Sequence, residues 1–280
     1  MQPARLQPTA MKHPRALPGI ALLLLACTFA GSSQAQSSSD EIAKYRAALA
    51  DGNPAELWEA KGEDLWKKKT GPNQQSLEQC DLGKGKGVVK GAYVELPRYF
   101  ADTGKVMDLE QRLMYCRMTL QGLTREQATQ NPFGSTGKAS DIEALVAYIT
   151  SESKGMKMAV TASLPEEQRM VEIGKQLFFY RAGSHDFACA TCHSNDGMRI
   201  RLQDLPNILK PADAQAAYTT WPAYRVSQGE VRTMQHRLAD CYRQQRFPVP
   251  GYASDALTAL SMFLAKNAEG GVFAAPGLKR

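Results

Sequence analysis

Phe187-Ala188-Cys189-Ala190-Thr191-Cys192-His193 places two cysteines three positions apart, with a histidine directly after the second. This C-x-x-C-H spacing is typical of covalent haem c attachment, in which both thiols bond the porphyrin and the histidine ligates the iron. A zinc site would need a second ligand pair, and a thioredoxin-like dithiol would need a βαβ context. The sequence has no second C-x-x-C. The motif therefore predicts one covalently bound haem c.

Residues 1–35 have the pattern of a signal peptide. Arg5, Lys12 and Arg15 form a basic start, an apolar run follows, and Ser33-Gln34-Ala35 suits cleavage. The apolar run is too short to span a bilayer, so we expect no membrane span. An alternative is lipid attachment at Cys27. Export predicts a periplasmic protein.

The charge of the chain does not favour nucleic-acid binding. Its formal net charge is +6, and residues 1–35 hold three basic and no acidic side chains, so the mature chain would carry +3. After export, five cysteines remain in an oxidising compartment. Haem attachment uses two and a disulfide could use two more, which leaves one to explain.

The apolar pattern predicts a mainly α fold, because helical spacing recurs and few segments look like strands. Its length suggests two domains, which we place at 36–155 and 156–280. In the second, Gly174 and Phe178 resemble the glycine and aromatic residue with which the first helix of class I c-type cytochromes crosses the last. The partner helix would be 254–266.

An internal repeat supports duplication of one domain. Arg112-Leu113-Met114-Tyr115-Cys116 matches Arg237-Leu238-Ala239-Asp240-Cys241 at arginine, leucine and cysteine. Each segment precedes a closing helix, in which Ala144-Leu145 aligns with Ala259-Leu260. We therefore expect two class I cytochrome c-like domains related by duplication.

The first domain should lack haem. Opposite the haem motif it carries Leu77 in place of the first cysteine and Asp81 in place of the histidine. Cys80 and Cys116 would then lie on a former haem pocket and could form a disulfide, although two unrelated buried thiols remain the alternative. Closing a loop of that size would stabilise the fold by about 3 to 4 kcal/mol on a chain-entropy estimate.

The second axial ligand of the haem has several candidates. Cys241 lies well past the motif and just before the closing helix, where a distal ligand is expected. Met198, Met234 and His236 are alternatives, and His185 lies on the proximal side. Ligation by Cys241 would put a reactive sulfur on the iron.

Arg237 lies four residues before Cys241, hence one helical turn away on the same face. A fixed cation there would lower the pKa of the thiol and could bind an oxyanion. A surface or haem-propionate contact is the alternative. Arg243 and Arg246 could add to the positive field.

Taken together, the paired domains, the haem motif and the segment Gln235-His236-Arg237-x-x-x-Cys241 resemble the SoxA family, the larger subunits of the SoxAX cytochromes of sulfur-oxidising bacteria. The resemblance implies that Cys189 and Cys192 attach haem and that His193 and Cys241 ligate its iron. It also implies that Cys241 is a catalytic cysteine persulfide and that Arg237 contacts substrate. Leu77 and Asp81 match the single-haem type.

The activity implied by the resemblance is that of an L-cysteine S-thiosulfotransferase with cytochrome c as electron acceptor. Thiosulfate would be joined oxidatively to a cysteine of a SoxYZ-like carrier, with a SoxX-like small cytochrome as partner in a heterodimer. One alternative is a plain electron-transfer cytochrome in which Met234 or His236 ligates iron. Another is a structural subunit with a vestigial haem.

Overall fold

The computed structural model describes residues 41, 44–45, 47–48, 52–134, 140–200 and 203–279. The expected signal peptide, with the alternative lipid site at Cys27, lies outside the described residues. Within the described ranges no helix is long and apolar enough to cross a membrane.

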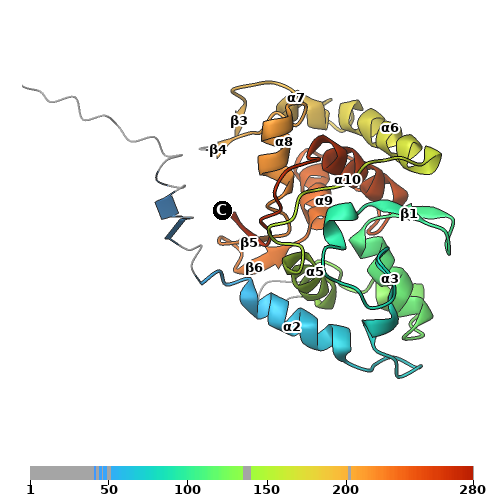
Figure 1. The fold of residues 1–280 in the computed structure, drawn as a ribbon. Coiled ribbons are helices and arrows are strands. Elements are labelled where there is room, and N and C mark those ends of the chain that lie inside the picture. Colours follow the sequence, from blue (N-terminus) through green and yellow to red (C-terminus); the bar gives the residue numbers. More distant parts are fainter. Residues whose placement is uncertain are drawn as a thin grey trace, which may run out of the picture. The chain divides into compact units, whose positions relative to one another are not determined.

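The first half of the fold, up to Ser151, is mainly helical, and two short strands form an antiparallel hairpin within it (Figure 1). Its elements in chain order are α2 (Glu56–Lys67), η1 (Leu77–Gln79), η2 (Tyr93–Glu95), β1 (Arg98–Phe100), β2 (Lys105–Met107), α3 (Leu109–Thr119), α4 (Arg125–Ala128) and α5 (Asp141–Ser151).

The second half has a similar order of elements, with more short strands than the sequence predicted. These are α6 (Pro165–Phe179), α7 (Cys189–His193), β3 (Arg199–Ile200), β4 (Gln203–Asp204), α8 (Pro211–Tyr218), β5 (Ala223–Arg225), β6 (Glu230–Arg232), α9 (Met234–Gln244), α10 (Asp255–Asn267) and β7 (Gly277–Lys279). Strands β3 and β4 pair as a hairpin, while β5 lies between antiparallel β6 and parallel β7. The mainly α prediction is confirmed.

Each half contains one close helix crossing that depends on glycine. A Cβ at Gly174 of α6 would lie 2.0 Å from the carbonyl oxygen of Ala259 in α10, and one at Gly62 of α2 would lie 2.0 Å from that of Ala144 in α5. Only a residue without a side chain permits this backbone approach. Figure 1 shows both pairs, α6 beside α10 and α2 beside α5. The predicted contact of Gly174 with the closing helix is confirmed.

The start of α2 differs from the sequence prediction. The helical spacing of the apolar side chains Leu57, Trp58, Leu65 and Trp66 predicts that they lie in the core. The Leu57 side chain is instead 73% exposed, and Trp66 is the fully buried aromatic residue of this helix. The first turn of α2 also carries the charged side chains Glu56 and Glu59. Helical spacing identified the element but not the extent of its buried face.

The two halves repeat the same arrangement before their arginine–cysteine segments. In each half, a cis peptide bond precedes a proline, Pro97 or Pro222. A hairpin of two three-residue strands follows, and then a helix. The arginine is the fourth residue of that helix in both, Arg112 in α3 and Arg237 in α9. Pro97 to Cys116 and Pro222 to Cys241 therefore correspond position by position, without insertion.

In the first half, the region equivalent to a haem site is filled by protein. Cys80 and Cys116 form a disulfide, which confirms that prediction. The Arg112 guanidinium is buried and donates to the backbone oxygen of Asp81 at 2.6 Å and to the carboxylate of Asp102 at 2.9 Å. Asp81 stands where the haem motif has its histidine, so side chains occupy the space that a porphyrin would need.

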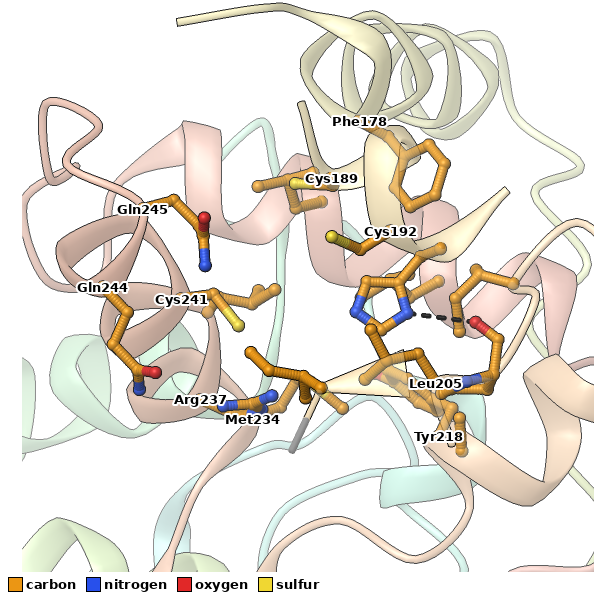
Figure 2. A pocket seen from close by; sticks show the side chains of 18 of the residues that line it. Phe178, Cys189, Cys192, Leu205, Tyr218, Met234, Arg237, Cys241, Gln244 and Gln245 are labelled. Carbon is orange, nitrogen blue, oxygen red and sulfur yellow. Dashed lines mark hydrogen bonds between the residues drawn. The ribbon is translucent and has the colours of Figure 1, made fainter. Parts of the chain in front are cut away.

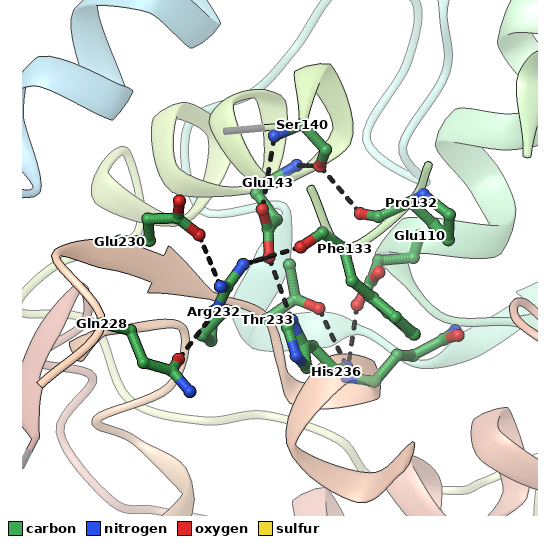
Figure 3. Close-up of polar contacts among 11 residues, drawn as sticks. Glu110, Pro132, Phe133, Ser140, Glu143, Gln228, Glu230, Arg232, Thr233 and His236 are labelled. Carbon is green, nitrogen blue, oxygen red and sulfur yellow. Dashed lines mark hydrogen bonds and ion pairs between the residues drawn. The ribbon is translucent and has the colours of Figure 1, made fainter. Parts of the chain in front are cut away.

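Buried polar side chains join the two halves, which lie within one compact unit, residues 38–280. The carboxylate of Glu143 in α5 is fully buried and accepts from Arg232 of β6 at 3.0 Å and contacts His236 of α9 at 3.1 Å (Figure 3). Glu143 also completes the capping box of α5 with Ser140. Because it binds groups from both halves, this carboxylate fixes α5 against β6 and α9.

A second polar contact between the halves is acidic. Asp108 and Glu110, at the start of α3, accept hydrogen bonds from the side chain and backbone of Gln235 in α9 at 2.6 and 3.3 Å. Burial and, to a lesser extent, the negative charge of Asp108 together raise the pKa of Glu110 to about 8. Burial also raises the pKa of Asp108. The folded protein thus holds a proton here that an unfolded chain would release.

Replacing Gly174 with alanine should destabilise the protein by about 3 kcal/mol, because the new methyl group requires α6 and α10 to separate. Denaturant unfolding of the purified protein measures this. Gly251→Ala is the matched control, since a Cβ there meets no atom within 4 Å, and it should change stability by less than about 0.5 kcal/mol. Equal stability of the two variants would contradict the close crossing.

Glu110→Gln should alter the pH dependence of stability. In the wild type, the folded state keeps the proton of Glu110 between about pH 4.5 and 8 while the unfolded state loses it, so this group makes stability fall as pH rises through that window. One proton corresponds to a slope of about 1.4 kcal/mol per pH unit, and glutamine should remove it. Chemical denaturation at several pH values tests this, and the exposed Glu166→Gln should keep the wild-type slope. An unchanged slope in Glu110→Gln would show that Glu110 is ionised in the folded protein.

Candidate functional site

A cavity of about 440 Å³ lies in the second half of the fold. The α6–α10 crossing contributes Phe178, Leu260 and Leu264 to its lining, and the haem motif on α7 and the arginine–cysteine segment on α9 contribute the reactive groups. Figure 2 shows the side chains of Cys189, Cys192, Arg237 and Cys241 around this common space. The lining is predominantly apolar, as suits a porphyrin ring.

The haem motif forms one short helix, α7, after an extended residue. Ala188 has an extended backbone, and its N–H donates to the hydroxyl of Thr191 at 2.9 Å, which fixes the start of the turn. Cys189, Cys192 and His193 all line the cavity. Neither cysteine forms a disulfide, so both sulfurs remain available for thioether bonds.

The imidazole of His193 is held by a hydrogen bond to the backbone of Pro206. Its Nδ1 lies 3.0 Å from the backbone oxygen of Pro206, which can only accept, so Nδ1 carries the proton and Nε2 keeps its lone pair. Burial lowers the pKa of this imidazole, and the positive charge of Arg237 lowers it further. A neutral imidazole with a free Nε2 is the form that ligates a metal.

Helix α9 brings Cys241 and Arg237 to the same cavity. The Thr233 hydroxyl caps this helix by accepting from the N–H of His236 at 3.1 Å, and the one-turn spacing then places both side chains on one face. Both line the cavity, and the Cys241 thiol is free. In the first half the equivalent Cys116 bonds to Cys80, the counterpart of Cys192. By analogy with this disulfide, we expect the Cys241 side chain to point toward Cys192 of the haem motif.

The pKa of Cys241 differs from the sequence expectation. Burial raises the pKa of the thiol, and Arg237 opposes this shift without overcoming it. The prediction that Arg237 lowers the pKa holds for the direction of its own effect and is wrong for the net shift of the unligated thiol. Burial likewise raises the pKa of Cys189 to about 12. A bound metal ion would itself favour the thiolate.

The alternative ligands are placed differently. His236 faces Glu143 and stacks on Phe133, with ring centroids 4.5 Å apart, and it is not part of the cavity lining (Figure 3). Met198 and His185 also lie outside the lining. Met234 does line the cavity, and its side chain is buried. Of the predicted alternatives to Cys241, only Met234 is therefore positioned near a haem.

The structure adds a residue that the sequence analysis missed. Arg225, the last residue of β5, lines the cavity beside Arg237. Extending the repeat backward from Cys241 to Pro222 would have aligned it with Phe100 and drawn attention to it. Of the other arginines considered, Arg243 is 70% exposed and pairs with Asp240, and neither it nor Arg246 lines the cavity.

The donor set fits haem c better than a bare metal ion. Two free thiols one turn apart, an oriented imidazole and a large apolar cavity are the features that thioether attachment and axial ligation need. Among the described residues, no group of three or more histidine, cysteine or acidic side chains could hold a metal ion directly. The residues present therefore fit the porphyrin.

Comparison with known proteins agrees with this site. The family model described as "SoxA/TsdA, cytochrome c domain" matches residues 61–158 and 173–273. The L-cysteine S-thiosulfotransferase subunit SoxA of Hydrogenophilus thermoluteolus is 52% identical, over 91% of this chain and 93% of the relative. The chain belongs to the SoxA family. The resemblance predicted from the sequence is confirmed.

Two further relatives extend the comparison. A SoxA subunit of Hydrogenobacter thermophilus is 32% identical, over 89% of this chain and 92% of the relative. The crystal structure of SoxXA from P. pantotrophus matches with a TM-score of 0.70 and 26% identity, covering 85% of this chain and 84% of that chain. The family fold, with its cytochrome c domains, thus spans most of the described chain.

Proposed function

We propose that this chain is the haem-bearing subunit of an L-cysteine S-thiosulfotransferase, which joins thiosulfate oxidatively to a cysteine of a carrier protein in the periplasm. The relatives that support this proposal are named as subunits of that enzyme. The observation that carries it is the position of Arg237 and the free Cys241 on the cavity that the haem motif also lines.

One haem c fits the second domain. Cys189 and Cys192 would attach it, His193 would ligate the iron through Nε2, and Cys241 would ligate from α9. The first domain keeps no equivalent site, because Leu77, Asp81 and the disulfide replace the required groups. When bound, haem c would supply a one-electron acceptor for the chemistry at Cys241. The domain limits, 36–155 and 156–280, and the signal peptide stay predictions.

Arg237 and Cys241 have different roles in the proposed reaction. Arg237 holds the oxyanion end of thiosulfate by charge-assisted hydrogen bonds, so the terminal sulfur faces Cys241. A sulfur–sulfur bond forms between that terminal sulfur and the sulfur on Cys241, and two electrons are released. The carrier thiolate then attacks the sulfur that was the terminal sulfur of thiosulfate. The bond between this sulfur and the sulfur on Cys241 breaks, so the thiosulfonate passes to the carrier and Cys241 leaves in its original form.

A partner cytochrome and a carrier complete the proposal. The solved structure of similar fold is a SoxXA complex, which supports a SoxX-like small cytochrome as partner in a heterodimer. Since the chain provides one haem and the reaction releases two electrons, a second acceptor on the partner suits the stoichiometry. The carrier is a SoxYZ-like protein with an accessible cysteine.

Intact mass under non-reducing conditions tests the composition of the site. We expect one haem c, one disulfide, and one additional sulfur atom that reductant removes. Cys241→Ala should lose the additional sulfur and keep the haem. Two haems, or a reducible bond between Cys189 and Cys192, would contradict the assignment.

The ferric EPR and near-infrared spectra test the axial ligand. Ligation by His193 and a Cys241 sulfur should give a thiolate–histidine spectrum, because the other axial donor is a neutral imidazole. Cys241→Ala should abolish it, while Met234→Leu and His236→Gln should retain it. A methionine–histidine or bis-histidine spectrum in the wild type, unchanged in Cys241→Ala, would favour the electron-carrier alternative.

Arg237→Ala should raise the KM for thiosulfate by about tenfold to a hundredfold, since charged hydrogen bonds contribute about 1.5 to 3 kcal/mol. Steady-state conjugation of thiosulfate to the carrier, with cytochrome c as acceptor, measures this. Arg243→Ala is a control on the same helix and should keep the KM within about threefold. Wild-type kinetics in Arg237→Ala would remove it from substrate binding.

A further inference from the structure

The repeated halves show what normally surrounds the arginine at this position. In the first half, the Arg112 guanidinium lies 4.1 Å from the centre of the Phe100 ring and 2.9 Å from the carboxylate of Asp102. An aromatic face and a carboxylate both stabilise a buried cation. The hairpin that precedes α3 thus stabilises the positive charge of Arg112.

The second half keeps the backbone arrangement but replaces both partners. Phe100, the last residue of β1, corresponds to Arg225, the last residue of β5. Two residues later in each hairpin turn, Asp102 corresponds to Ser227. A guanidinium thus replaces the aromatic ring, and a hydroxyl replaces the carboxylate. Arg112 has two groups nearby that stabilise its positive charge, whereas at Arg237 one of them is replaced by a second positive charge.

The immediate surroundings of Arg225 do not neutralise it. Its side chain is half-buried and lines the cavity, and it forms no ion pair within 4 Å with any residue in the described ranges. Burial lowers the pKa of Arg225, and the charge of Arg237 adds to that effect. Asp240, the nearby carboxylate, lies 3.8 Å from Arg237 and also pairs with Arg243. Of the other charged side chains on the cavity, Asp204 pairs with Arg199, and Lys279 of β7, the register partner of Arg225, is a further cation.

We infer that Arg225 is a second substrate-binding residue, which with Arg237 forms a two-guanidinium site for the oxyanion end of a thiosulfate-type anion. Two cations on one cavity wall repel each other unless an anion lies between them. A tetrahedral oxyanion has enough acceptor oxygens for both planar guanidinium groups. This inference rests on the proposed function, because it names the group that orients its substrate.

Arg225→Gln, with Arg225→Lys as the charge-retaining variant, tests the inference in the haem-loaded protein. Binding of sulfate and of thiosulfate is measured by titration calorimetry at low ionic strength. We expect Arg225→Gln to weaken both anions by about tenfold or more and Arg225→Lys to recover part of the loss. Arg181→Gln removes one exposed arginine that does not line the cavity and should leave both affinities unchanged.

Turnover provides a separate readout. Arg225→Gln should raise the KM for thiosulfate by about the same factor and change kcat by less than about threefold, since the residue binds the oxyanion and not the reacting sulfur. Unchanged anion affinity and KM in an active Arg225→Gln enzyme would overturn the inference and leave the proposed function intact.

Two other outcomes are equally decisive. If Arg225→Gln shifts the reduction potential of the haem while sulfate and thiosulfate bind as in the wild type, Arg225 compensates the charge of the cofactor and the inference fails. If the wild type binds both anions through Arg225 but conjugates no thiosulfate to a carrier, the anion site stands and the proposed function fails.

Discussion

The crossing of α6 and α10 at Gly174 is the contact on which the site depends. It brings two helices that are about eighty residues apart in sequence into backbone contact, and their side chains Phe178, Leu260 and Leu264 then form one wall of the cavity. The same contact recurs at Gly62 in the first half, where the Cys80–Cys116 disulfide and the buried Arg112 occupy the corresponding region. The crossing is therefore necessary for the site but does not create it.

The two halves differ in what lies between the short helix at the first sulfur and the helix that carries the arginine and the second cysteine. These helices are η1 and α3 in the first half, and α7 and α9 in the second. In the first half a disulfide draws Cys80 and Cys116 together, and Arg112 is buried against Phe100, Asp102 and the backbone of Asp81. In the second half the corresponding sulfurs remain free and a cavity of about 440 Å³ separates their helices. The first half therefore has a structural role, and the second half carries the candidate reactive site.

Buried polar contacts connect the first half to the elements that carry the candidate site. Glu143 of the first half binds Arg232 and His236 (Figure 3). The carboxyl pair of Asp108 and Glu110 binds Gln235. These partners lie in β6 and the first turn of α9, directly before Arg237. Leaving any of these groups unpaired in the interior would be costly, so the first half fixes the position of the helix that carries the reactive sulfur.

The sequence by itself determined the features that depend on local spacing. The C-x-x-C-H motif, the repeated arginine and cysteine, the substituted positions Leu77 and Asp81, and the helical spacing of apolar residues can all be read along the chain. They identified the family, the fold class and the disulfide. Tertiary structure decided what depends on contacts between distant segments: that His236 binds Glu143 and leaves the haem cavity, that Leu57 is exposed, that burial dominates the pKa of Cys241, and that Arg225 lies beside Arg237. The physical reason is that burial, charge pairing and side-chain direction are set by neighbours from other elements, and a linear pattern does not contain them.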